Sequence, residues 1–366
     1  AAKLLENVSG AACVMDIYNG DIVSMVSSPS FDPNSFVHGI KQKEWNGLLN
    51  NRDKPLINKA ISGLYPPGST IKTLTALSAL ENDVVSSKLI VTCKGYVDLH
   101  GERFHCWKKK GHGVVGMRTA IKKSCDVYFY EVARRLGIDR LAATAEKFGL
   151  GKKVLQNYNE EKKGVVPNTK WKIRELGKNW YLGETLHSGI GQGYFLTTPL
   201  QLSLMTAQIA NGGFKIKPRI LVDENDKVSN LQKYLNHKNS TPGNIMSTDD
   251  QIFNFGLQPL FRNQENINLV KDAMFAATNE VGGTSYRSRL KTKKFMFAGK
   301  TGSSQIKRFT NEQREAEVKQ ENITYLERDH AWFVAFAPVS EPRYAISVLV
   351  EHGGSGSKAA APIASK

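Results

Sequence analysis

At residues 65–72 the chain reads Tyr-Pro-Pro-Gly-Ser-Thr-Ile-Lys, where an extended segment gives way to a helix. The two prolines and the glycine end the extended approach, and Ser69 then opens a helix whose apolar residues recur at helical spacing as far as Leu80. Ser69 and Lys72 are three positions apart, so their side chains share one face of that helix. The stretch therefore predicts a paired hydroxyl and amine at a helix N-terminus.

This pairing suits nucleophilic chemistry. A serine hydroxyl attacks poorly until a base removes its proton, and a desolvated lysine with a lowered pKa can be that base. The free amides of a helix N-terminus also stabilise developing negative charge. The S-x-x-K spacing alone is weak evidence, because it recurs at Ser288, Ser304 and Ser355. Only Ser69 combines the spacing with an approach turn and a following amphipathic helix.

Strand patterns lie at the two ends of the chain. Residues 11–27 predict two strands around an Asn-Gly turn, and residues 294–303, 331–339 and 343–350 are strand-like as well. The middle is helical, with amphipathic stretches at 69–80 and 138–148 and a helix begun by Thr198-Pro199. The pattern predicts an α/β (α+β) sandwich with one helical subdomain, and residues 307–329 as a solvated loop.

Composition narrows the class of protein. The chain has 366 residues, and 50 Lys+Arg against 34 Asp+Glu give a net charge of +16. The composition is globular and excludes a disordered, collagen-like or disulfide-stapled chain. The basic residues are scattered and carry no nucleic-acid-binding signature, so we interpret the charge as a solvated surface and expect no nucleic-acid partner. The longest apolar run, residues 331–339, is far shorter than the ~20 residues of a membrane span.

Two further polar groups accompany the first. Ser124-Cys125-Asp126 works best as a turn that presents Ser124 and Asp126 to one cavity, although S-x-D is also a common helix N-cap. Lys300-Thr301-Gly302-Ser303 ends a predicted strand with a cation, a hydroxyl and a glycine, which can line a cleft and bind a substrate carboxylate. The sequence therefore predicts one site built from three separate segments.

In this order, S-x-x-K, S-x-D and K-T-G resemble the motif set of penicillin-binding proteins and serine β-lactamases. Residues 30–34, 189–193 and 197–201 resemble class B transpeptidases. Residues 106–113 resemble the elongation-type branch, penicillin-binding protein 2. The broad family has Asn where this chain has Asp126, and that branch often carries Asp. The resemblance implies the transpeptidase fold, with an antiparallel sheet from about 8–30 and 292–350 and a helical subdomain at about 69–290, in one domain over 1–366.

The resemblance also implies roles. Ser69 attacks the penultimate D-Ala of a stem peptide, Lys72 is the base, Ser124 relays protons, and Asp126 positions Lys72 or the substrate amide. Lys300 and Thr301 bind the substrate carboxylate. Gly302 and Ser303 line the same strand, and the N–H groups of Ser69 and Ser303 form the oxyanion hole. A second stem peptide then resolves the ester, and β-lactams acylate the same serine.

A possible metal site lies among four cysteines. Cys13 is predicted to be an inert core thiol, whereas Cys93, Cys106, His112 and Cys125 read C-x12-C-x5-H-x12-C. Cys3His is a common structural zinc set. Zinc, a disulfide and three unrelated thiols all remain open, with His100 and His105 as alternative ligands. Some relatives in the resembled branch hold zinc at matching positions, which implies a structural zinc behind the Ser124 turn and no cofactor for catalysis.

Two rival functions share these motifs. A serine β-lactamase needs a base for deacylation, and the surroundings of Glu160 and Glu161 do not resemble a deacylation loop. A non-catalytic receptor for β-lactams or muropeptides would form an adduct and cross-link nothing. The resemblance favours the transpeptidase, with a RodA-type glycosyltransferase and an MreC-type scaffold as partners. It also implies an N-terminal membrane anchor and a pedestal domain outside this sequence, at the periplasmic face of the bacterial inner membrane.

Overall fold

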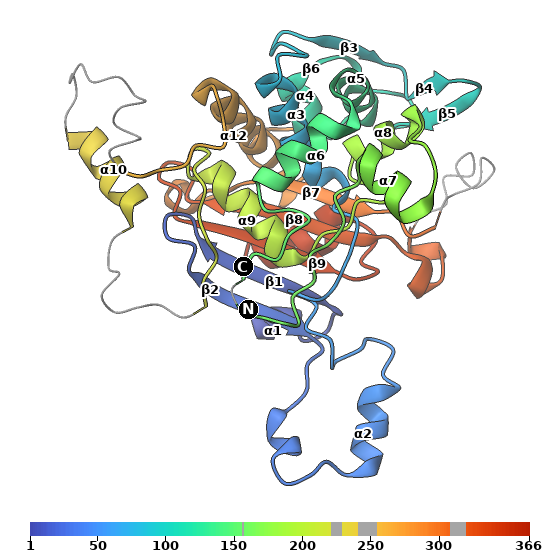
Figure 1. The fold of residues 1–366 in the computed structure, drawn as a ribbon, viewed down its shortest axis with the longest axis vertical. Coiled ribbons are helices and arrows are strands. Elements are labelled where there is room, and N and C mark those ends of the chain that lie inside the picture. The colour runs from blue at the N-terminus through green and yellow to red at the C-terminus, as the bar shows by residue number, and fades with distance from the viewer. Residues whose placement is uncertain (156, 221–228, 241–254, 308–319) are drawn as a thin grey trace.

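A five-stranded antiparallel sheet lies at the centre of the molecule in a computed structural model, which describes residues 1–155, 157–220, 229–240, 255–307 and 320–366 (Figure 1). The strand order β2-β1-β9-β8-β7 brings the two ends of the chain together in one sheet. The strands are β1 (Gly10–Asp16), β2 (Ile22–Ser28), β7 (Ala298–Ser304), β8 (His330–Ala337) and β9 (Tyr344–Val350). The predicted fold class is confirmed.

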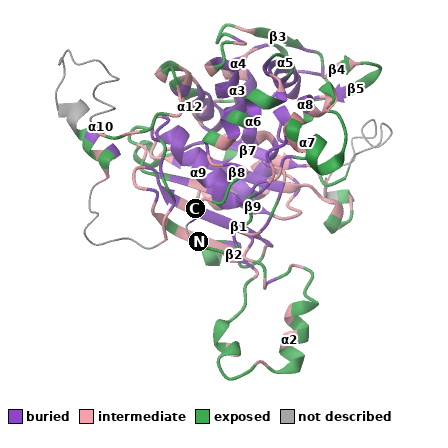
Figure 2. Cartoon of the chain, viewed as in Figure 1, coloured by how far each residue is buried: buried purple, intermediate pink, exposed green. Residues whose placement is uncertain are grey.

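Both faces of the sheet are covered, as the buried strands in Figure 2 show. Along β8, Trp332 and its alternate neighbours pack into the larger core, while Phe333 and its alternate neighbours pack into a second core on the opposite face. Side chains alternate between faces along a strand, so a strand buried on both sides is apolar throughout. This explains why residues 331–337 form a continuous apolar run.

Helices pack on one face of the sheet and continue above it. Helix α9 lies against β1, β8 and β9, and α12 lies against β7. Thr198 caps the start of α9 with Pro199 in its first turn, as the sequence predicts, and Gln201 completes a capping box. The helices on this side are α3 (Lys72–Glu81), α4 (Met117–Lys122), α5 (Asp126–Leu136), α6 (Ile138–Lys147), α7 (Thr169–Leu176), α8 (Leu182–Gly189), α9 (Pro199–Ala210) and α12 (Gln264–Asn279).

Shorter elements complete the chain. The opposite face of the sheet is covered by α1 (Ala2–Leu5), a π-helical turn (Gly356–Ala360) and α14 (Ala361–Ala364). An excursion with α2 (Gln42–Leu49) projects away from the body (Figure 1). Helix α10 spans Asn230–Ser240, and two small ladders pair β3 (Ile90–Cys93) with β6 (Gly113–Gly116) and β4 (Tyr96–Leu99) with β5 (Glu102–His105).

The start of the helix after the approach turn differs in detail from the expectation. Residues 68–71 form a 3₁₀ turn, and the α-helix α3 begins only at Lys72. Tighter 3₁₀ turns are frequent at helix N-termini, and residues three apart eclipse in them, so Ser69 and Lys72 keep a common face. Of the predicted loop at 307–329, residues 308–319 lie outside the described residues. Among the described residues, no helix is both long and apolar enough to cross a membrane.

Candidate active site

The approach turn is held by close backbone contacts that require glycine. Gly68 has φ +54°, and a Cβ there would lie 2.6 Å from the carbonyl oxygen of Ser303 on β7. Gly191 has φ +75°, and its Cβ would lie 2.2 Å from the oxygen of Gly68, whose N–H donates to Gly191 across 2.9 Å. Only glycine tolerates this conformation and this proximity. The two contacts fix Ser69 at a cleft beside β7.

Lys72 lies wholly buried beneath that cleft. Its Nζ atom lies 2.6 Å from Oδ1 of Asp126, and it also donates to the carbonyl oxygen of Ser124 at 3.0 Å and to Ser124 Oγ at 3.3 Å. Burial raises the pKa of Asp126, and the Lys72 charge opposes that rise. The contact with Lys72 therefore offsets part of the cost of burying the Asp126 carboxylate.

Ser124 adopts the left-handed conformation, with φ +54°. Helix α4 ends just before it and α5 begins at Asp126, so the residues between them form the predicted turn. A non-glycine residue in this region carries backbone strain, and such strain concentrates at functional sites. The turn presents Ser124 Oγ to two lysines at once.

The second of these lysines is Lys300, from the K-T-G segment of β7. Its Nζ atom donates to Ser124 Oγ across 2.8 Å and to the carbonyl of Thr301 across 3.0 Å. Burial, assisted by the charge of Lys72, holds the pKa of Lys300 well below its usual range. A lysine whose pKa is lowered by burial gives up its proton more readily than an exposed lysine does.

These groups open onto one cleft of about 870 Å³. Ser69, Ser124 and Asp126 line it together with the segment Thr301, Gly302 and Ser303. Every predicted catalytic residue therefore lies at the cleft or, like Lys72 and Lys300, within hydrogen-bond reach of a group that lines it. The structure brings together three segments that lie far apart in the sequence.

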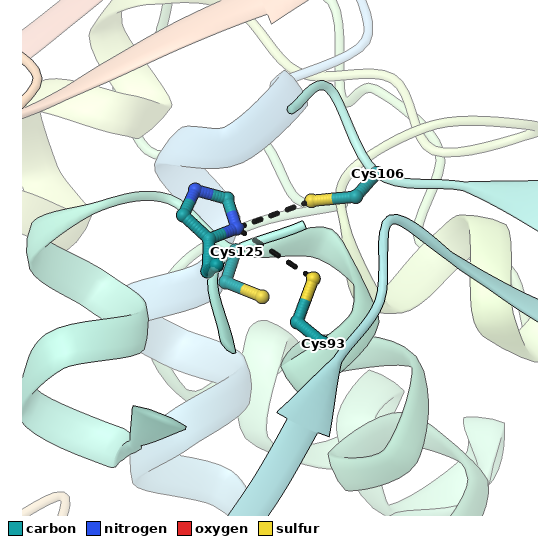
Figure 3. A group of neighbouring side chains, drawn as sticks. Cys93, Cys106 and Cys125 are labelled. Atoms are coloured by element: carbon teal, nitrogen blue, oxygen red, sulfur yellow. Dashed lines mark hydrogen bonds between the residues drawn. The ribbon is translucent and has the colours of Figure 1, made fainter. Parts of the chain in front are cut away.

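The four predicted metal ligands also meet. The sulfur atoms of Cys93, Cys106 and Cys125 point toward one another in Figure 3, and one ligand atom from each of these and His112 lies within 4.8 Å of the others. His112 Nδ1 lies 3.5 Å from Cys106 Sγ and 3.7 Å from Cys93 Sγ. All four cysteines are free thiols, and His100 and His105 are not members of the group.

The donor set fits zinc by chemistry and by spacing. Zinc bonds of about 2.3 Å to sulfur and about 2.0 Å to nitrogen, arranged as a tetrahedron, place nitrogen and sulfur about 3.5 Å apart. The spacings of His112 match that edge. Hydrogen bonds from the Cys125 thiol and from His112 hold the pKa of Cys106 well below its usual range, as a metal-binding thiolate requires. One feature is unusual, because buried His112 Nε2 has no hydrogen-bond partner among the described residues.

A comparison with known protein families gives the identity of the fold. The family model of the penicillin binding protein transpeptidase domain matches residues 10–366. The chain belongs to this family. The resemblance inferred from the three motifs is thereby confirmed.

The relatives of this chain include proteins named MrdA or PBP2. The peptidoglycan D,D-transpeptidase MrdA of Acinetobacter baumannii is 37% identical over 99% of this chain and 51% of its own. The penicillin-binding protein PBP2 of Helicobacter pylori, solved in complex with MreC, matches 99% of this chain and 60% of its own at 32% identity and a TM-score of 0.82. PBP2 of Pseudomonas aeruginosa, solved in complex with WCK 5153, matches 99% of this chain and 71% of its own at 34% identity and a TM-score of 0.80. The chain spans about half the length of the curated relatives it matches.

Three further residues that line the cleft make hydrogen bonds that the sequence did not predict. Trp107 donates its backbone N–H to Asp126 Oδ2 across 2.8 Å and its indole N–H to the carbonyl of Ser124 across 3.0 Å. Thr284 accepts from the hydroxyl of Thr301 at 3.0 Å, and Gln192 donates to the carbonyl of Ser303 at 3.1 Å. Trp107 and Gln192 lie within motifs that carry the resemblance, whereas no sequence pattern marks Thr284.

Glu161 lies outside this cleft. The side chain is buried, and its carboxylate accepts the backbone N–H groups of Val154 at 2.7 Å and Leu155 at 3.0 Å. Neither Glu160 nor Glu161 lines the cleft. Glu161 therefore organises its own loop.

Proposed function

We propose that this chain is the catalytic part of a peptidoglycan D,D-transpeptidase that cross-links stem peptides during cell elongation. The observation that carries the proposal is the convergence of Lys72 and Lys300 on the hydroxyl of Ser124, at the cleft that Ser69 lines. A scaffold protein has no use for two buried lysines around one hydroxyl. A transpeptidase needs them, because protons must move between a nucleophile and two amines.

Acylation begins with Ser69. Its oxygen attacks the carbonyl carbon of the penultimate D-Ala while its proton passes to Lys72, which acts as a base only in its neutral amine form. Ser124 lies within reach of Lys72 and passes a proton to the departing nitrogen. The peptide bond breaks, free D-alanine leaves, and the donor remains as an ester on Ser69.

Substrate orientation comes from β7. This strand forms one edge of the sheet, so an extended peptide can add to it as a further strand. Lys300 and Thr301 then receive the terminal carboxylate, and the N–H groups of Ser69 and Ser303 receive the oxyanion. Gly302 allows the strand to pack tightly, since a Cβ there would lie 2.9 Å from Thr70 Cγ2.

The ester is resolved by the amine of a second stem peptide. The amine attacks the ester carbonyl and gives up a proton to Ser124, a proton passes through Lys72 to the departing oxygen of Ser69, and a new amide links the two peptides. Hydrolysis, the β-lactamase outcome, needs a base aimed at a water molecule. Glu161 does not offer one, because its carboxylate is occupied by two backbone amides away from the cleft.

Zinc is proposed as a structural element of the same molecule. Cys93, Cys106, His112 and Cys125 would hold it, and four protein ligands leave no position for substrate. Bound there, the ion would supply a rigid cross-link between segments. Cys125 adjoins Ser124, and Cys93 and Cys106 flank the β4–β5 hairpin whose Glu102 and Phe104 line the cleft.

The remaining expectations rest on the relatives. We expect residues 1–366 to act as one transpeptidase domain, with stem peptides and β-lactams as ligands. Relatives such as MrdA are about twice as long as this chain, and we assign the additional length to a membrane anchor and a pedestal domain. A RodA-type glycosyltransferase and an MreC-type scaffold are the expected protein partners, at the periplasmic face of the inner membrane.

The proposal is tested by intact-protein mass spectrometry after incubation with benzylpenicillin. We expect a single adduct that persists for hours on the wild-type protein and is absent from Ser69→Ala. An adduct that disappears while hydrolysed drug accumulates would identify a β-lactamase. The absence of any adduct would contradict the assignment of Ser69.

A further inference from the structure

Asp329 is a partly buried carboxylate at the same cleft. It precedes β8 and lines the cleft with Ser69. Its oxygens accept from the side-chain amide of Gln320 at 3.0 Å and from the backbone N–H of Ile306 at 3.4 Å. Within the described ranges of the chain, no lysine, arginine or histidine forms an ion pair with it. Asp126, a buried carboxylate at this cleft, is paired with Lys72.

This arrangement destabilises the folded protein when no ligand is bound. A carboxylate removed from water without a counter-charge is destabilised, and here burial raises the pKa of Asp329 to about 6. The chain has a net charge of +16, so cations are abundant elsewhere. A carboxylate offers about four acceptor positions, of which the two neutral donors occupy two. Capacity for a cationic ligand therefore remains.

Gln320 fixes the orientation of Asp329. Its amide oxygen accepts the backbone N–H of Asp329 at 2.8 Å while its NH₂ group donates to the carboxylate, so the two residues are joined by reciprocal bonds. The carbonyl of Asp329 also accepts from Gly354 at 2.8 Å, next to Ser355, which lines the cleft. A side chain held by its neighbours in this way is pre-organised for binding.

The register of a bound peptide along β7 determines which of its residues lies near Asp329. If the terminal carboxylate of a donor lies at Thr301 and its reactive carbonyl at Ser69, the peptide extends along β7 by about 3.3 Å per residue. The direction is toward Gln305 and Ile306, which follow the end of β7 and line the same cleft. At this spacing the residue before the reactive D-Ala lies near Ser304, about two residues short of Ile306, whose N–H binds Asp329. An extended side chain of lysine length spans the remaining distance of about 6.6 Å.

We propose that Asp329, oriented by Gln320, is a specificity-determining residue that binds the side-chain ammonium of the diamino acid at the third position of the donor stem peptide. The inference rests on the proposed function, because it takes the register from a donor bound at Ser69. The contact is a charge-assisted hydrogen bond, which is stronger than one between neutral groups.

The test uses three penicillins. Two carry a side chain of lysine length that ends in a primary amine or in the matching acetamide, and benzylpenicillin serves as the neutral reference. The second-order acylation rate constants of the wild-type protein, Asp329→Asn, Asp329→Glu and Glu102→Gln are measured by intact mass. Glu102→Gln is the matched control, because Glu102 also lines the cleft but belongs to the β4–β5 hairpin.

We expect the wild-type protein to react about tenfold faster with the amine than with the acetamide, since a hydrogen bond between charged groups is replaced by a neutral one. Asp329→Asn should lose this preference and keep the benzylpenicillin rate, which also shows that the variant is folded. Asp329→Glu should restore part of the preference, and Glu102→Gln should retain all of it.

Two results would overturn this inference and leave the proposed function intact. One is a wild-type protein that does not distinguish amine from acetamide, and the other is an Asp329→Asn variant that slows all three penicillins equally. A wild-type protein that benzylpenicillin fails to acylate would overturn the proposed function, and this inference with it.

Discussion

The Nζ atom of Lys300 lies 2.8 Å from the hydroxyl oxygen of Ser124, although 176 positions separate the two residues. Lys72 approaches the same oxygen from the α3 side at 3.3 Å. One hydroxyl thus connects the edge strand of the sheet to the helix that follows the nucleophile. This connection gives protons a path between the two lysines, and the account of catalysis depends on it.

The substitution Ser124→Ala tests that path. It removes the hydroxyl but leaves Lys72 bonded to Asp126 and Lys300 bonded to the carbonyl of Thr301. We expect acylation by benzylpenicillin to slow by about 10²–10³-fold, the usual contribution of a positioned proton-transfer group. The free energy of unfolding, measured in urea, should fall by only about 1 kcal/mol. Acylation at the wild-type rate would show that Ser124 carries no proton.

The buried pair of Lys72 and Asp126 makes a prediction about stability. Lys72→Met leaves the Asp126 carboxylate buried without a counter-charge, which costs about 3–5 kcal/mol in comparable pairs. Acylation should be lost as well. The double variant Lys72→Met with Asp126→Asn should regain a large part of the stability and none of the activity. If the double variant is as unstable as Lys72→Met alone, the destabilisation does not come from the unpaired charge.

Spacing and turn chemistry were sufficient to predict the three motif segments and the composition of the sheet. The turn at Ser124 follows from Ser-x-Asp before an apolar helix, and the start of the helix at Thr198 follows from Thr-Pro. Local rules work there because the side chains of each motif form hydrogen bonds with nearby backbone groups. The positive φ of Ser124 and the 3₁₀ turn at residues 68–71 were not predicted by these local rules.

Contacts between distant segments could not be predicted in this way. Trp107 binds Asp126 through a backbone N–H, which any residue type could supply. Thr284 is one threonine among many until the chain brings it to Thr301. Asp329 lies in a charged stretch that we interpreted as a solvated loop, and its burial depends on the packing of Gln320 and Gly354. Such residues carry no periodic or motif signal.

The cysteine cluster predicts a bound metal in the purified protein. We expect about one zinc per chain by elemental analysis when no chelator is used, and loss of that zinc in Cys106→Ser. The matched control is Cys13→Ser, because Cys13 is equally buried but lies in β1 away from the cluster. Because loss of the metal should lower stability, Cys106→Ser should melt at a lower temperature than Cys13→Ser. Equal zinc content in the two variants would contradict the assignment of these ligands.

His330 predicts a loss of stability in mild acid. Burial, with a smaller effect of His352, lowers the pKa of His330 to about 4 from 6.5, so the folded state binds fewer protons than the unfolded state between these values. Its contribution is complete above pH 6.5 and is lost as the pH falls toward 4. Between pH 7 and pH 5 this amounts to about 2 kcal/mol.

The variant His330→Asn isolates this effect. Asp329 acts in the opposite direction, because its raised pKa makes the folded state bind more protons in the same range. Neither residue is a cause of the pKa shift of the other, so a comparison of wild-type and variant unfolding at both pH values cancels the contribution of Asp329. The advantage of the wild-type protein should shrink at pH 5, and an unchanged difference would show that His330 titrates normally in the folded state.

Cross-linking itself is the most direct test. The protein is incubated with a donor stem pentapeptide ending in D-Ala-D-Ala and an acceptor stem peptide with a free amine, and products are identified by mass spectrometry. The account predicts a product with the combined mass of donor and acceptor less one D-alanine, formed by the wild-type protein and not by Ser69→Ala. A donor that is only hydrolysed, or that remains on Ser69 without ever reaching the acceptor, would contradict it.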